Sequence, residues 1–169
     1  SGVYTIKSTS TVLTGAGKLA ALDLVTVTNS SSNNSTFTIK AVVSTTEFTV
    51  EEIVTDETAD GSTSVTLDHT GFVTDKAKGD GYYSQPDGVH TVAYQIVNLG
   101  DSTDDFNGTI KMQGTLATTP TEDDWFDVHT YTAAQETATK YVNFTGNFVF
   151  VRAKLVYTDG TVNSIRLNH

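Results

Sequence analysis

The stretch that decides the fold is residues 107–128, which read NGTIKMQGTLATTPTEDDWFDV. Apolar and polar residues alternate in its first half. The alternation places Ile110, Met112 and Leu116 on one face of an extended strand. Gly114 interrupts this apolar face, so we expect a bulge or a closely approaching backbone there.

The second half of the stretch predicts a polar turn followed by an aromatic anchor. Pro120 ends the strand, because proline has no N–H to donate to a β-ladder. Trp125, the only tryptophan, and Phe126 follow. Four acidic residues surround this aromatic pair: Glu122, Asp123, Asp124 and Asp127. We find no pattern of catalytic residues in the stretch.

The composition favours an all-β protein. The chain has 169 residues, of which 37% are hydrophobic and only two are proline, so it can bury a sizeable core. Threonine occurs 31 times. It is β-branched and favours strands, and its hydroxyl suits the solvated face of a sheet.

Residues 1–74 predict a small antiparallel β module. Polar turns, among them the Asn/Ser cluster at 29–34, separate short strand-like runs. The expected strands are 3–6, 22–28, 36–43, 47–54 and 62–67. Two interpretations of the first run remain open: an arm that pairs with a neighbouring subunit, or the first strand of the module itself.

Residues 75–88 indicate a linker or seam between two units, because glycine, lysine and Pro86 punctuate them. Tyr82 and Tyr83 lie inside this segment. Adjacent residues of an extended segment face opposite ways, so one tyrosine is expected to pack inward. An exposed tyrosine here is a candidate binding contact, and filling the seam is the competing interpretation.

Residues 89–169 predict a β-sandwich or jelly-roll-like unit. Strands are expected at 89–99, with Val92, Tyr94 and Ile96 on one face, and at 148–157, with Phe148, Phe150 and Leu155 buried. The sequence leaves 130–140 open between a loop and one helical turn. Asp159-Gly160 predicts a tight hairpin turn into a returning strand that carries Val162, Ile165 and Leu167.

Charge and composition exclude several classes of partner. The net charge is −10 and the pI about 4.5, which argues against binding nucleic acid through phosphates. There is no cysteine, so no disulfide or thiolate metal site forms. No apolar run is long enough to span a bilayer, and the first residues lack the apolar region of a signal peptide. We expect neither nucleic acid nor membrane as a partner.

The sequence indicates a protein without enzymatic activity. The four histidines, His69, His90, His129 and His169, are scattered, and none has the spacing of a helical zinc pair. The chain contains no HExxH, GxSxG, phosphate-loop or dinucleotide-binding motif. We therefore expect neither catalytic residues nor a cofactor.

Two weaker signals remain as candidate ligand sites. Glu122, Asp123, Asp124 and Asp127 could supply oxygen ligands for calcium, as could the second acidic turn of Asp101, Asp104 and Asp105. Neither turn has the EF-hand spacing, and acidic turns are usually solvated. Trp125 could stack on a sugar ring, although a role as a buried anchor is the stronger expectation.

Two segments resemble structural proteins in the virions of tailed bacteriophages. Residues 25–67, VTVTNSSSNNSTFTIKAVVSTTEFTVEEIVTDETADGSTSVTL, are similar to a small β module that recurs in such proteins. Residues 106–128 and 145–169, FNGTIKMQGTLATTPTEDDWFDV and TGNFVFVRAKLVYTDGTVNSIRLNH, resemble the end of virion proteins from phages of marine and cyanobacterial hosts. The family supplies no catalytic residues.

The resemblance implies a structural subunit located in the virion, whose partners are other capsid or tail proteins and further copies of itself. Small size and the lack of a fibre-like repeat favour capsid decoration over a tail, neck or baseplate position. The candidate assembly interface combines the N-terminal run, Val3, Tyr4 and Ile6, with Tyr82 and Tyr83. A carbohydrate-binding module or host-surface adhesin that uses Trp125 is the main alternative.

Overall fold

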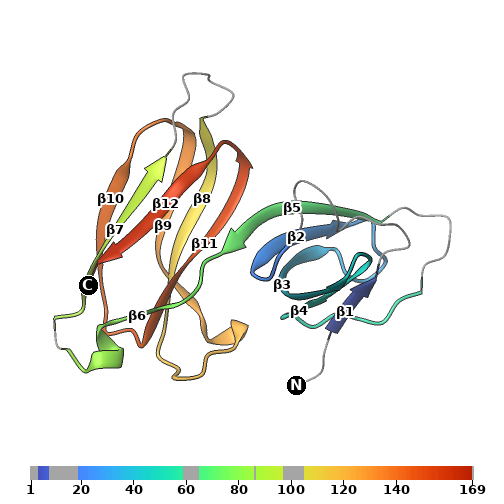
Figure 1. The fold of residues 1–169 in the computed structure, drawn as a ribbon, viewed down its shortest axis with the longest axis horizontal. Helices are drawn as coiled ribbons and strands as arrows, with labels where there is room; N and C mark the ends of the chain where they lie inside the picture. The colour runs from blue at the N-terminus through green and yellow to red at the C-terminus, as the bar shows by residue number, and fades with distance from the viewer. Residues whose placement is uncertain (1–3, 8–18, 59–64, 86, 97–104, 169) are drawn as a thin grey trace. The chain divides into compact units, whose positions relative to one another are not determined.

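The computed structural model describes residues 4–7, 19–58, 65–85, 87–96 and 105–168, and every regular element there except two short 3-10 helices is a β-strand (Figure 1). The chain divides into two units, residues 1–73 and 74–169. The all-β fold class is confirmed. The segment 75–88, for which the sequence indicates a linker, belongs to the second unit.

The first unit is one antiparallel set of strands in the order β1-β4-β3-β2-β5. The strands are β1 (Tyr4–Lys7), β2 (Asp23–Thr28), β3 (Ser35–Ser44), β4 (Glu47–Val50) and β5 (Thr66–Val73). Alternate residues of β2, β3 and β4 are buried together in one core of Val25, Val27, Phe37, Ile39, Phe48 and Val50. Burial of these apolar side chains is the main stabilising contribution in this unit.

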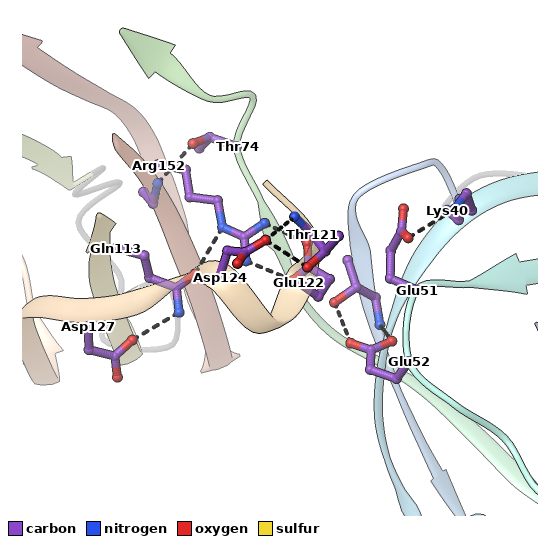
Figure 2. A network of polar contacts seen from close by, with 12 residues as sticks. Lys40, Glu51, Glu52, Thr74, Gln113, Thr121, Glu122, Asp124, Asp127 and Arg152 are labelled. Carbon is purple, nitrogen blue, oxygen red and sulfur yellow. Dashed lines mark hydrogen bonds and ion pairs between the residues drawn. The ribbon is translucent and has the colours of Figure 1, made fainter. Parts of the chain in front are cut away.

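Strand β4 ends four residues earlier than the sequence indicates, at Val50. The Glu52 carboxylate accepts hydrogen bonds from the backbone N–H and the hydroxyl of buried Thr38, at 2.7 and 2.8 Å (Figure 2). A side chain therefore occupies the Thr38 donor that a longer β4 would have used. Strand β5 extends to Val73, beyond the predicted end at Leu67.

The second unit is a sandwich of two antiparallel sheets, stacked in Figure 1. One sheet contains β6 (Ala77–Lys78), β11 (Phe150–Asp159), β8 (Phe106–Thr115) and β9 (Phe126–Glu136), in that order. The other has the order β10 (Lys140–Thr145), β7 (Val89–Ile96) and β12 (Val162–Asn168). The 3-10 helices are η1 (Asp80–Tyr83) and η2 (Glu122–Asp124).

Strand β7 supplies the inner face of the smaller sheet. Val92, Tyr94 and Ile96 are buried, as the alternation predicts. From the facing sheet, β8 buries Ile110 and Met112. The predicted burial of Phe148, Phe150 and Leu155 in and before β11 is also confirmed.

The interruption at Gly114 is explained by an aromatic ring. A Cβ on Gly114 would lie 2.6 Å from the Phe148 ring, so the ring occupies the space of a side chain. The β8–β9 register also shifts between Met112 and Gln113, which is a bulge next to this glycine. Leu116, placed on the apolar face by alternation, is instead 65% exposed, because β8 ends at Thr115.

Neither interpretation left open for residues 130–140, a loop or one helical turn, describes residues 130–136, which are part of a strand. Residues 126–136 form β9, which pairs with β8 along its length. Ala, Gln and Glu at 133–136 favour helix, but pairing with a neighbouring strand outweighs that weak local preference. The strand lies at the sheet edge and buries only Ala133 fully, so its apolar alternation is faint.

The hairpin predicted at Asp159-Gly160 is also wrong. Strand β11 pairs with β8 and β6, whereas β12 pairs with β7 of the other sheet. The turn therefore carries the chain from one sheet to the other. Gly160 has a φ of 78°, and a Cβ there would lie 2.6 Å from the Asp105 backbone, so the position requires glycine.

Candidate functional site

The helix η1 presents two tyrosines on the surface of the second unit. Its backbone is bound to the segment just before β11 by the Gly79 and Gly81 N–H groups, which donate to the carbonyls of Val149 and Phe148 at 3.0 and 2.9 Å. A Cβ on Gly81 would lie 2.6 Å from the Asn147 carbonyl oxygen. Glycine therefore allows η1 to lie directly against the neighbouring backbone.

Tyr82 and Tyr83 are 46% and 51% exposed, and their rings meet edge to face with centroids 5.2 Å apart. Lys78 Nζ lies 4.1 Å from the Tyr82 ring centroid. Tyr82 also packs against Phe150, whose ring carries Lys76 Nζ at 4.7 Å. We call Lys76, Lys78, Tyr82 and Tyr83 the tyrosine–lysine patch.

The N-terminal residues of the predicted interface pack within the first unit. Strand β1 pairs with β4, and Tyr4 and Ile6 pack against the apolar core. The run is thus the first strand of the module in this structure, and those side chains do not extend as an arm. Val3 lies outside the described residues.

The four acidic residues around Trp125 do not converge on a common ligand position. Asp124 caps η2, where its carboxylate accepts hydrogen bonds from the Thr121 N–H and hydroxyl at 2.7 and 2.8 Å. These bonds lower the pKa of Asp124. Asp127 accepts hydrogen bonds from Lys111 and Gln113, Glu122 is paired with Arg152, and Asp123 is exposed.

Arg152 organises this region (Figure 2). It is only 6% exposed, and its Nη1 and Nη2 each donate to one carboxylate oxygen of Glu122 at 2.7 Å. Its Nε donates to Gln113 at 2.9 Å, and Gln113 in turn donates to Asp127. Burial raises the pKa of Asp127, but the hydrogen bonds from Lys111 and Gln113 outweigh it, so the pKa is lowered.

Trp125 is half-buried beside this network. The Arg152 guanidinium lies 4.2 Å from the Trp125 ring centroid, which is a cation–π contact. The guanidinium therefore occupies one face of the ring that the sugar-stacking interpretation would use. Nothing in the sequence pattern indicates the Arg152–Glu122 pair, because the two residues are 30 positions apart and neither belongs to a recognisable motif.

No metal-binding cluster forms among the described residues. Within these ranges, no group of three or more histidine, cysteine or acidic side chains is arranged to hold a metal ion. Asp101 and Asp104 of the second acidic turn and His169 lie outside the described residues. His90 is buried, its Nε2 lies 2.9 Å from the Gly146 carbonyl oxygen, and it stacks on Phe144.

Sequence reasoning missed a carboxylate-centred loop in the first unit. Glu57 accepts hydrogen bonds from the Ser30 hydroxyl, the Ser32 N–H and the Asn33 amide, at 2.8 to 3.0 Å. These bonds, chiefly that of Ser30, lower the pKa of Glu57. The Asn/Ser cluster at 29–34 predicts a turn, but the sequence does not indicate that Glu57, more distant in the chain, closes it.

A second tyrosine pair crosses the sandwich of the second unit. Tyr94 and Tyr131 stack with centroids 5.4 Å apart, and the Tyr131 hydroxyl donates to Glu136 at 2.6 Å. Burial raises the pKa of both tyrosines, and the Glu136 carboxylate raises that of Tyr131 further. Tyr94 is buried in the core, whereas Tyr131, on the edge strand β9, is partly exposed.

Comparison with known proteins gives no relative. No protein family matches the sequence, and neither the curated proteins nor the solved structures contain a match. Among the described residues, no helix has the length and apolar character required to cross a bilayer.

Proposed function

We propose that the chain is a structural subunit of a phage virion and acts by protein–protein assembly, without catalysis. The observation that carries this proposal is the tyrosine–lysine patch. Tyr82 and Tyr83 belong to the interface expected from the sequence, are about half exposed, and are held in place by η1. Rigid, exposed tyrosines bury a large area at low entropic cost when a partner binds.

The charge of the patch suits another copy of the chain as the partner. Lys76 and Lys78 flank the tyrosines, whereas the whole chain carries 20 acidic and 10 basic residues. A basic patch on an acidic protein favours contact with an acidic surface of a neighbouring copy or another particle protein. Copy number then multiplies weak individual contacts in a symmetric particle.

Capsid decoration is the position in the particle that we propose, with a tail, neck or baseplate position as the alternative. The resemblance of residues 25–67, 106–128 and 145–169 to virion proteins supports this assignment. The alternative of a carbohydrate-binding module centred on Trp125 loses support, because Arg152 covers one face of that ring.

Two measurements test the proposal. Light scattering at increasing concentration is expected to give a mass that is a multiple of 18.1 kDa, and the double variant Tyr82→Ala/Tyr83→Ala is expected to return it to the monomer. Tyr141→Ala, which removes an exposed tyrosine on β10, is the matched control and is expected to leave the mass unchanged. A monomer at every concentration contradicts self-assembly through the patch.

The location is tested separately by mass spectrometry of particles purified from a culture that carries the gene. The chain is expected in the particle fraction at a fixed ratio to the major capsid protein. Its absence from purified particles would contradict the virion assignment, whatever the oligomeric state in solution.

A further inference from the structure

The outer face of the β10–β7–β12 sheet carries a row of three side chains that do not contribute to the core. Tyr141 of β10 and Arg166 of β12 both lie opposite Ala93 of β7. Directly opposed residues of an antiparallel sheet share a face. The neighbours of Ala93 in β7, Val92 and Tyr94, are buried inside the sandwich, so the row points away from it.

Ala93 is the smallest member of the row, and a hollow lies over it. The hollow has a volume of about 220 Å³ and is lined by Ala93, Gln95, Thr139 and Arg166. Tyr141 stands beside Ala93 and is 77% exposed. The volume is below the roughly 300–1,000 Å³ of pockets for drug-sized ligands, so it suits a single ring or a terminal group.

The charge on this face differs from that of the whole protein. Although the net charge of the chain is −10, the outward positions of the three strands include no acidic residue. They are Val89, Thr91, Ala93, Gln95, Tyr141, Asn143, Thr145, Ser164, Arg166 and Asn168. Arg166 is their only charge and forms no salt bridge within the described ranges.

The amides on this face are oriented to donate hydrogen bonds. The Thr91 hydroxyl donates to Asn143 Oδ1 at 2.9 Å, and the Ser164 hydroxyl donates to Gln95 Oε1 at 2.9 Å. Each amide oxygen is therefore occupied, and each NH₂ group remains to donate outward. Together with Arg166, these groups match a ligand rich in oxygen acceptors that carries negative charge.

We propose that this face binds an acidic sugar of the uronic acid type, as part of a glycan chain. The Arg166 guanidinium pairs with the sugar carboxylate, because its planar fork matches that group. The amide NH₂ groups of Gln95 and Asn143 donate to ring and hydroxyl oxygens. The Tyr141 ring stacks on the apolar face of the sugar.

A glycan fits this face better than an acidic protein surface does. Apart from Tyr141, the only large exposed apolar side chain among its outward positions is Val89. Protein interfaces bury a core of apolar and aromatic residues, which this face does not offer. The site is separate from the tyrosine–lysine patch, and the inference does not depend on the proposed virion function.

The test is titration of the whole chain with a galacturonate trisaccharide and with the neutral galactose trisaccharide of the same linkage. Calorimetry gives the affinity, and NMR amide shifts locate the site. The acidic sugar is expected to bind about tenfold or more tightly than the neutral one, with the largest shifts around Ala93 and Arg166. Arg166→Gln is expected to remove this preference, and Ala93→Leu to block binding by filling the hollow.

Matched variants distinguish a loss of sugar binding at this face from a loss caused by unfolding or by removal of any exposed side chain. Tyr141→Ala is expected to weaken the binding of both sugars, whereas Leu116→Ala, which truncates an exposed side chain after β8, is expected to change the binding of neither. All these side chains except that of Ala93, which is partly buried, are exposed, so their variants are expected to have the melting temperature of the parent. For Ala93→Leu, an unchanged melting temperature shows that lost binding is not due to unfolding.

Three outcomes would overturn the proposal. In the first, the parent chain binds neither sugar. In the second, it binds galacturonate with the same affinity after Arg166→Gln. In the third, polyglutamate binds this face as tightly as galacturonate of equal charge, which would assign the face to an acidic protein partner.

Discussion

The Arg152 guanidinium donates two hydrogen bonds, each 2.7 Å long, to the two carboxylate oxygens of Glu122. Arg152 lies near the start of β11, and Glu122 opens the helix η2 that follows β8. The contact therefore ties the turn between β8 and β9 to a central strand of the larger sheet. Because Arg152 is buried, loss of Glu122 leaves a buried charge without its main partner.

Glu122→Gln is expected to destabilise the second unit by about 1–3 kcal/mol. The figure is below that for a fully buried pair, because the Glu122 side chain is 21% exposed and solvent screens it. Urea unfolding followed by Trp125 fluorescence measures the effect, since Trp125 stacks on the same guanidinium. Asp123→Asn on the exposed neighbour is the control and is expected to change stability by less than about 0.5 kcal/mol. Equal effects of the two variants would mean that the pair contributes nothing.

Gly114→Ala is expected to destabilise the second unit by about 1–3 kcal/mol, because the added Cβ would lie 2.6 Å from the Phe148 ring. A Cβ on Gly146 would also lie 2.1 Å from this ring, so the surroundings of Phe148 are tightly packed at two positions. Thermal unfolding of the single variant gives the loss.

A double-mutant cycle identifies the cause. Phe148→Leu removes the ring, so Gly114→Ala should cost less in that background than in the parent. Strictly additive effects would show that the destabilisation of Gly114→Ala does not arise from the ring.

The Tyr131–Glu136 hydrogen bond should make the stability of the second unit depend on pH. That bond is the main cause of the lowered pKa of Glu136, and Lys140, 3.3 Å away, adds to it. A carboxyl group whose folded pKa lies below its ordinary value of 4.5 contributes stability that is complete above pH 4.5. The contribution is lost as the pH falls through the folded pKa.

The melting temperature of the second unit should therefore fall more steeply below pH 4.5 in the parent than in Glu136→Gln, whose side chain does not titrate. Glu47→Gln, a surface acid of the first unit, is the control and should leave this slope unchanged. Identical slopes for the parent and Glu136→Gln would exclude Glu136 as a source of the pH dependence.

How far the sequence predicts this fold depends on how completely each strand is buried. Strand β7 buries every second residue, so its alternation is clear, and its position was predicted closely. Strands β2 and β3 also bury alternate apolar residues in the core of the first unit, and their positions were predicted closely as well. Strand β9 lies at an edge and buries one residue fully, so its pattern was too faint to distinguish from a turn. The turn at Asp159-Gly160 was located correctly, but its local geometry does not reveal which sheet the next strand joins.

Of the two candidate binding surfaces, the sequence could indicate only the one whose residues are adjacent in the chain. Tyr82 and Tyr83 could be singled out as adjacent aromatics in a glycine-rich segment. The expectation that one of them packs inward was wrong: both are about half exposed, because the segment forms the 3-10 helix η1 and not an extended strand. The row Tyr141–Ala93–Arg166 could not be found, because strands from three parts of the chain bring its members together. Such a row depends on strand order and register, which local sequence patterns do not specify.

Glu57 closes a loop in the first unit. Its carboxylate accepts the Ser32 N–H at 2.9 Å, while the Ser30 hydroxyl, itself bound to Glu57, accepts the Asn33 N–H at 2.9 Å. Both amides should therefore exchange slowly with solvent deuterium. Glu57→Gln is expected to speed the exchange of Ser32 most, because a neutral amide accepts more weakly than a carboxylate.

The exchange rate of the Ser32 amide should also depend on pH, because only the ionised Glu57 carboxylate accepts its hydrogen bond strongly. Since the pKa of Glu57 is lowered from 4.5, the extra protection of Ser32 should persist at pH 4.5 and disappear only as the pH falls through the folded pKa. Amide exchange measured by NMR from pH 6 to pH 3, corrected for the intrinsic rate at each pH, tests this. Glu51→Gln, which removes an exposed ion pair with Lys40 in the same unit, is the control and should leave Ser32 protected. Equal protection of Ser32 in the parent and in Glu57→Gln would show that other contacts order the loop and that the carboxylate is dispensable.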